Sequence, residues 1–216
     1  MNLAITLVFL VGGILCLVAG LRRAEWETDG WRTVFAGLHP VNLAVYIAVP
    51  VCLLGLWALH GDHLAPLALC RAHLVLLTGL AACISDIREN RIPNTLILVM
   101  LAGWAVTTLP EFFIDVQGAI VELLAAFLGF VAGGAIFLLV YVISKKGLGG
   151  GDVKLMAAMG LYVTVRNVFP VMLSGCILAA ATGLVLILTG KLNRKDPMPL
   201  APFLYAGLLL TLAFNL

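Results

Sequence analysis

The chain has 216 residues, of which 62% are hydrophobic and 11% are charged, whereas a soluble domain usually carries about 25% charged residues. The net charge is only +2, and without a basic tail or a stacking aromatic stripe this gives no support for binding nucleic acid. We therefore expect an all-α, polytopic membrane protein that lies in the lipid bilayer and has no sizeable soluble domain.

The apolar runs predict a bundle of about eight transmembrane helices, because one crossing needs about 20 apolar residues. We expect a single membrane domain over residues 1–216, in which 1–60 adds N-terminal helices and 66–216 forms the catalytic core. One expected helix is short enough to be tilted, re-entrant or continuous with the glycines before it. In chain order the helices cover 3–21, 41–59, 66–86, 94–110, 118–143, 153–165 (the short one), 168–190 and 200–216.

Lysine and arginine residues predict the orientation of the helices, because cytoplasmic connections are rich in them. Of the 13 lysine and arginine residues, all but Arg71 and Arg166 fall in connections on the same side of the membrane. Acidic residues gather in the connections of the other side, at positions 62, 111, 115 and 122. We therefore expect a multi-pass protein of the cytoplasmic (inner) membrane with both termini outside. The basic residues on the cytoplasmic side are Arg22, Arg23, Arg32, Arg88, Arg91, Lys145, Lys146, Lys154, Lys191, Arg194 and Lys195.

Two polar segments, residues 86–94 and 149–154, interrupt the apolar sequence. Each places one aspartate, Asp86 or Asp152, at the edge of a span, where an ionisable group is costly and is by default functional. Because two expected helices separate them, both aspartates should return to the cytoplasmic side. A close pair of carboxylates shares a proton and can activate water, as in aspartic proteases. The pair predicts peptide hydrolysis without a metal, a cofactor or a covalent intermediate.

Each segment also has a plain structural interpretation. Asp86 can be a helix-end charge in an ordinary inner loop, where Pro93 ends one element and starts the next. Gly149 to Gly151 can be a turn whose following helix is capped by Asp152, or they can admit unusual backbone angles and the close approach of a substrate strand. Lys154 can orient Asp152 or a substrate carbonyl, or can simply be a cytoplasmic lysine.

In these segments the chain resembles the prepilin leader peptidases, membrane aspartyl proteases named for a G-x-G-D motif. Gly149, Gly151 and Asp152 match that motif, and Lys154 matches the lysine that commonly follows it. Asp86, followed by Ile92-Pro93-Asn94, matches the other aspartate segment of the family. Pro199-Leu-Ala-Pro202-Phe203 resembles the P-x-x-P-F start of its last helix. The resemblance covers roughly residues 70–210, with the segments in the expected order.

The resemblance implies cleavage of short, basic leaders from prepilin-like precursors at the cytoplasmic face, just before the hydrophobic helix of the precursor. It makes Asp86 and Asp152 the catalytic pair, with Gly149, Gly151, Lys154, Pro93 and Asn94 binding the substrate or supporting the motifs. Larger family members also carry a methylating domain with paired C-x-x-C motifs, whereas the loop from 22 to 40 has no cysteine. We expect a peptidase without methyltransferase activity, like the short forms that serve tight-adherence (Flp-type) pili or archaeal flagellins.

Two other functions remain open at the level of sequence. The same aspartates could serve a proton- or cation-coupled carrier beside a broken helix, although a carrier needs its site near the midplane of the bilayer. The chain could also be an inactive assembly component that keeps the fold. Gly129 and Gly133, spaced as G-x-x-x-G, indicate close helix packing and no site.

Overall fold

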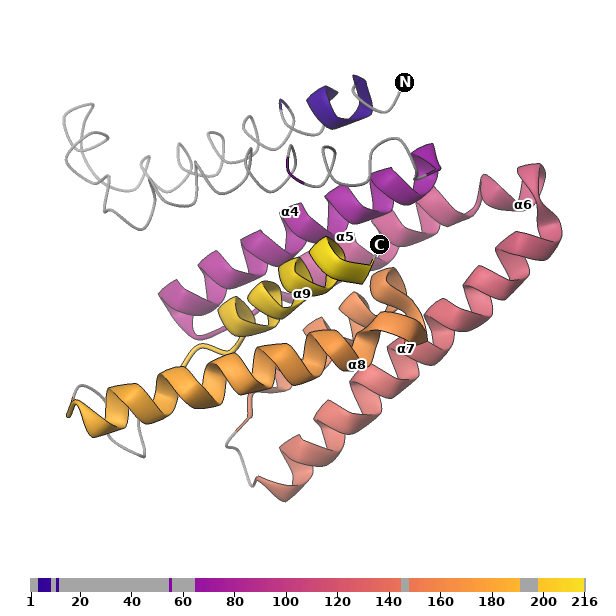
Figure 1. Ribbon diagram of the computed structural model, residues 1–216. Coiled ribbons are helices and arrows are strands. Elements are labelled where there is room, and N and C mark those ends of the chain that lie inside the picture. Colours follow the sequence, from indigo (N-terminus) through magenta and orange to yellow (C-terminus); the bar gives the residue numbers. More distant parts are fainter. Residues whose placement is uncertain are drawn as a thin grey trace. The chain divides into compact units, whose positions relative to one another are not determined.

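The computed structural model describes residues 4–8, 11, 55, 65–144, 148–190 and 198–215 (Figure 1). The chain divides into two compact units, Met1–His73 and Leu74–Leu216, and both aspartates belong to the second. The described part is helical and contains no strand, which confirms the all-α prediction. Its main helices are α4 (Pro66–Glu89), α5 (Asn94–Thr108), α6 (Glu111–Ile114), α7 (Val116–Ile143), α8 (Gly150–Leu188) and α9 (Ala201–Asn215).

Several of these helices have the length and composition of membrane spans. Among the described residues there are 4 such spans, and a shorter apolar helix, Ala201–Phe214, follows them. The predicted helices 3–21 and 41–59 lie almost entirely outside the described residues, so the total of about eight stays a prediction. The spans are Pro66–Ile87, Asn94–Ile114, Val116–Ile143 and Gly150–Leu188.

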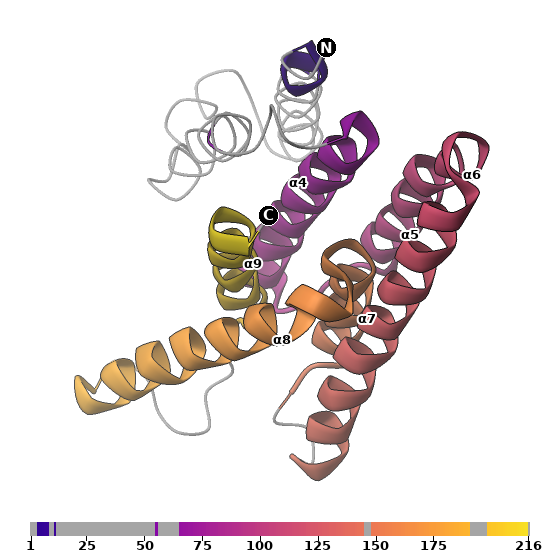
Figure 2. The ribbon, with the colours of Figure 1, turned by 45° about the vertical axis from the view of Figure 1, so that its right-hand side comes forward.

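The predicted helices 153–165 and 168–190 are two arms of one element, α8. The break lies at Thr164, whose φ of 58° and ψ of 177° are not helical, and Figure 2 shows the change of direction. The first arm begins at Gly150 and is therefore continuous with the glycine segment. The predicted division into two helices is confirmed, but the break lies at Thr164, just before the expected gap at residues 166–167, and it needs no loop.

Local sequence explains where the elements around the site begin and end. α4 ends at Glu89, and the next residue, Asn90, has a positive φ of 50°, a left-handed conformation that asparagine tolerates better than most residues. The Ser85 hydroxyl donates to the Arg91 carbonyl across 2.7 Å and holds the connection against α4. Pro93, with φ −63° and ψ 137°, then starts α5.

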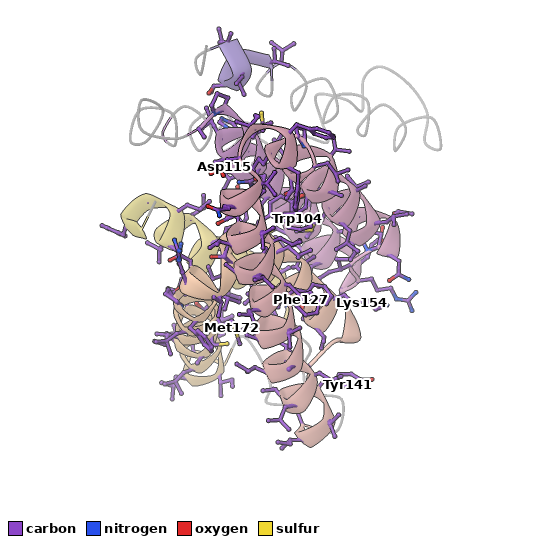
Figure 3. The ribbon with its side chains drawn as sticks, turned by 90° about the vertical axis from the view of Figure 1, so that its right-hand side faces the viewer. Trp104, Asp115, Phe127, Tyr141, Lys154 and Met172 are labelled. Atoms are coloured by element: carbon purple, nitrogen blue, oxygen red, sulfur yellow. The ribbon has the colours of Figure 1, made fainter. Side chains whose placement is uncertain are left out.

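The two spans between the aspartates form an outward and a return path. α5 and α7 meet at α6, so that α7 brings the chain back toward the end at which α5 began (Figure 2). Asp115 caps the start of α7 by accepting a hydrogen bond from the Gly118 N–H across 3.1 Å. It lies at the opposite end of α7 from Tyr141 (Figure 3). This path returns Asp152 to the level of Asp86.

Glycines let α7 and α8 approach backbone to backbone. A Cβ at Gly129 would contact the Gly160 carbonyl oxygen, and a Cβ at Gly133 would lie 2.9 Å from the Met156 carbonyl oxygen. Neither position therefore has room for a side chain. The predicted role of the G-x-x-x-G spacing in helix packing is thereby confirmed, and the partner is the first arm of α8.

The helix α9 packs closely against the second arm of α8. A Cβ at Gly175 would lie 3.0 Å from the Leu204 Cα, and one at Gly207 would lie 2.5 Å from the Val171 carbonyl oxygen. On α4, a Cβ at Gly79 would lie 3.0 Å from the Tyr205 ring. The start of α9 therefore has a fixed position beside the end of α4.

Candidate active site

Asp86 lies in the last turn of α4, and its side chain is only 6% exposed. Its Oδ2 atom accepts a hydrogen bond from the Ala201 N–H across 2.9 Å, so a residue of α4 caps the distant helix α9. The Asn90 N–H donates to the Asp86 carbonyl at 2.9 Å, which completes the end of α4. Asp86 is thus an ordered, buried carboxylate and not a solvated loop charge.

Asp152 lies in the first turn of α8, and its side chain is 8% exposed. Its Oδ2 atom accepts a hydrogen bond from the Gly149 N–H across 3.2 Å, which is the helix cap that the sequence allowed. Its Oδ1 atom is buried without a hydrogen-bond partner. The cap therefore uses one oxygen of Asp152 and leaves the other one available for a ligand.

The two aspartates lie close enough to interact electrostatically. The charge of Asp86 acts on the Asp152 carboxyl group, although the two residues are 66 positions apart in the sequence. In general, two carboxylates held close together do not both ionise readily and share one proton. Such a pair can then supply a base and an acid to the same reacting group.

Two further contacts join the segments that carry the aspartates. A Cβ at Gly151 would lie 3.2 Å from the Ile92 Cβ, so the glycine lets the connection after α4 rest against the start of α8. Beside it, the Lys154 Nζ donates to the Asn94 Oδ1 atom across 2.9 Å. Lys154 lies at the surface of the bundle (Figure 3), where this contact links the starts of α5 and α8.

The contacts revise the expected role of the glycine segment. None of Gly149, Gly150 and Gly151 has a positive φ, and Gly149 is extended with φ −77° and ψ 141°. Of the two interpretations left open for this segment, the backbone angles are those of an ordinary helix start, without the positive φ that glycine would permit. The space beside Gly151 is taken by Ile92 of the same chain, so its closest neighbour there is internal.

Some residues of the site could not be found from the sequence. Ala201 contributes only backbone atoms, and an alanine gives no signal for such a role, although the prolines around it mark the segment. Ile92 was part of a recognised motif, yet nothing in the sequence indicated that it would contact Gly151. Asn90 had a usable signal, because an asparagine after a helix and shortly before a proline is typical of a left-handed helix end.

Comparisons with known proteins identify related sequences. A family model described as "Type IV leader peptidase family" matches residues 73–184, a range that contains both aspartates. A curated protein of Burkholderia pseudomallei (strain K96243), named prepilin leader peptidase/N-methyltransferase, is 30% identical over 189 residues, covering 85% of this chain and 57% of the relative.

More distant relatives bear the same curated name. The protein of Bacillus subtilis (strain 168) is 28% identical over 137 residues, which cover 61% of this chain and 50% of that protein. That of Xanthomonas campestris pv. campestris is 26% identical over 132 residues, which cover 61% and 43%. The chain thus spans about half the length of the curated relatives it matches. No solved structure matches the chain.

Proposed function

The chain belongs to the type IV leader peptidase family, and from this premise we propose that it is a membrane aspartyl endopeptidase that removes short basic leaders from prepilin-like precursors. The observation that supports the proposal is that two buried carboxylates, Asp86 and Asp152, interact electrostatically although they lie at the ends of separate helices. Relatives that match the chain in sequence bear the name prepilin leader peptidase/N-methyltransferase.

In the proposed reaction the ionised aspartate takes a proton from a water molecule, and the water oxygen attacks the scissile carbonyl carbon. The protonated aspartate donates its hydrogen to the carbonyl oxygen, and the tetrahedral intermediate then collapses with protonation of the leaving amine. The Asp152 Oδ1 atom, buried without a partner, supports this scheme. A buried polar atom needs a partner, and the attacking water or the substrate carbonyl would supply it.

We place the reaction at the cytoplasmic face of the inner membrane. Asp86 and Asp152 lie at the ends of α4 and α8 that adjoin basic segments, with Arg91 after the first and Lys154 beside the second. A precursor with a basic leader and an apolar helix would present its cleavage site at this level. The 216 residues have five cysteines and no C-x-x-C pair, so we propose the peptidase reaction without N-methylation.

The carrier hypothesis has less support. A coupled carrier needs its ionisable groups near the midplane, with access from both sides, whereas Asp86 and Asp152 lie at helix ends. The family match also concerns peptidases.

Cleavage of a precursor tests the proposal directly. Membranes that contain the protein, incubated with a precursor that has a basic leader and an apolar helix, should yield a shorter product on a gel. EDTA should leave the rate largely unchanged, because the aspartate pair activates water without a metal. Membranes from cells that lack the protein are the control. No cleavage of any such precursor, or inhibition by EDTA that added zinc reverses, would contradict the proposed mechanism.

The membrane orientation gives a separate prediction. In a background without the native cysteines, a cysteine at Glu89 should react with an impermeant reagent only after the cytoplasmic side is exposed. A cysteine at Asp115 should react in intact cells, because a span separates it from the ends that carry the aspartates. Each position serves as the control for the other. Labelling of position 89 in intact cells would place the aspartates on the outer side.

A further inference from the structure

The proline-containing segment Pro199-Leu200-Ala201-Pro202 has no part in the reaction above, yet it contacts Asp86. The Ala201 N–H donates to Asp86 Oδ2 at 2.9 Å. One turn earlier on α4, the Cys83 thiol donates to the Ala201 carbonyl oxygen at 3.4 Å. Both polar groups of the Ala201 backbone therefore bind the end of α4.

We propose that Ala201 is a positioning residue, whose backbone N–H holds the Asp86 carboxylate in the orientation in which it meets Asp152. The inference rests on the proposed function, because the orientation of Asp86 matters to a reaction only if Asp86 takes part in cleavage. It assigns a role to the proline-containing segment that the catalytic pair alone does not explain.

The prolines of the segment leave it few backbone donors. Proline has no N–H and a fixed φ, so Leu200 and Ala201 are the residues of this segment that can donate. The Leu200 carbonyl accepts from the Phe203 N–H at 3.0 Å and the Leu204 N–H at 3.2 Å, so the first helical turn begins just after Leu200. The Ala201 N–H is therefore among those that have no partner inside the helix, and Asp86 supplies its acceptor.

The hydrogen bond between Ala201 and Asp86 is buried, which shields it from competition with water. Ala201 is 0% exposed and Asp86 is 6% exposed, so water cannot readily replace either partner. The N-terminal end of a helix also carries a partial positive charge that favours a nearby carboxylate. Since Gly175 and Gly207 fix α9 against α8, the helix that bears Asp152 also sets the position of the donor for Asp86.

Replacing one backbone N–H by an ester oxygen tests the role of Ala201 with little change of shape. An α-hydroxy acid incorporated in the full-length protein would replace Ala201, and the same replacement at Ala206, inside α9, is the matched control. Each variant loses one backbone donor. We expect the ester at 201 to lower kcat about tenfold to 100-fold, the scale of a hydrogen bond to a charged group. KM should stay unchanged, because this N–H faces Asp86 and not the substrate.

The control and the stability measurement separate positioning from folding. The ester at 206 should lower the melting temperature in detergent about as much as the ester at 201 but leave kcat within about threefold of wild type. Equal kcat values for the two ester variants would overturn the inference, as would a loss at 201 that only follows the folded fraction. If the wild-type protein cleaved no precursor, or if Asp86→Asn cleaved normally, the proposed function itself would fail.

Discussion

Asp86→Asn and Asp152→Asn should each lower precursor cleavage by at least about 100-fold, the lower end of what a positioned acid or base contributes. Either change removes the ability of the pair to hold one proton and one negative charge. Cleavage by purified membranes, resolved on a gel and corrected for the amount of each variant, measures the effect. The double variant should be no worse than the single variants, because the two groups act as a unit.

Asparagine is the informative replacement because it keeps the hydrogen bonds that hold the structure together. Its amide oxygen can accept from the Ala201 N–H at position 86 and from the Gly149 N–H at position 152, as the carboxylates do. Asparagine also caps helices about as well as aspartate. Both variants should therefore insert, accumulate and melt close to wild type.

Asp115→Asn is the matched control. Asp115 also caps a helix through a backbone N–H, but it lies at the opposite end of α7 from the site. The same chemical change there should leave cleavage within about twofold of wild type, as is usual for a surface substitution. Cleavage near the normal rate in Asp86→Asn or Asp152→Asn would remove that residue from the catalytic pair.

Gly151→Val should lower the cleavage rate by more than it lowers the amount of folded protein. A Cβ at this position already lies 3.2 Å from the Ile92 Cβ and 3.5 Å from the Ile92 backbone nitrogen, so the two methyl groups of valine must push Ile92 away. Ile92 belongs to the connection that begins at the end of α4, directly after Asp86. We expect roughly tenfold slower cleavage or worse, since an ångström of misplacement at a catalytic group costs about 100-fold.

Neighbouring glycine substitutions make this prediction specific. Gly151→Ala should be intermediate, because its single methyl group needs Ile92 to yield by only a few tenths of an ångström. Gly150→Ala should leave cleavage unchanged and the melting temperature equal or higher, because nothing lies within 4 Å of a Cβ there and alanine favours the helix. Measuring the melting temperature in detergent beside the cleavage rate decides the matter. If activity fell only with the folded fraction, the contact with Ile92 would be merely structural.

The fold was predictable where hydrophobicity decides the structure. Long apolar runs separated by Pro93 and by polar loops gave the ranges of α4, α5 and α7 to within a few residues. The break within α8 was predicted close to its place because Arg166 and Asn167 interrupt the apolar sequence, but the sequence did not show that Thr164 would make the bend without a loop. Thr164 lies against α7, where a Cβ at Gly129 would lie 2.6 Å from the Thr164 carbonyl carbon, and the sequence gives no sign of such a contact between distant segments.

The candidate site was predictable as a pair of residues but not as a structure. Asp86 and Asp152 stood out because charged groups at the edge of apolar spans need a reason to be there, and counting crossings placed them on one side. The sequence could not show that Ala201 would cap Asp86, because a backbone donor leaves no residue-specific trace. Nor could it show that Gly151 accommodates Ile92, because a glycine is compatible with a turn, a cap or a close contact.

The contact between α7 and α8 also limits how the protein can change by mutation. A Cβ at Gly129 would meet the Gly160 carbonyl, and a Cβ at Gly160 would meet the Gly129 carbonyl. Because each obstacle is a main-chain atom, no second substitution elsewhere can make room for a side chain at either position. A disturbed core can often be restored by a second mutation that makes a neighbouring side chain smaller. That route is closed here, because the atoms in the way do not belong to a side chain. We therefore expect random mutagenesis followed by selection for activity to recover glycine at both positions, with no suppressor pairs between them.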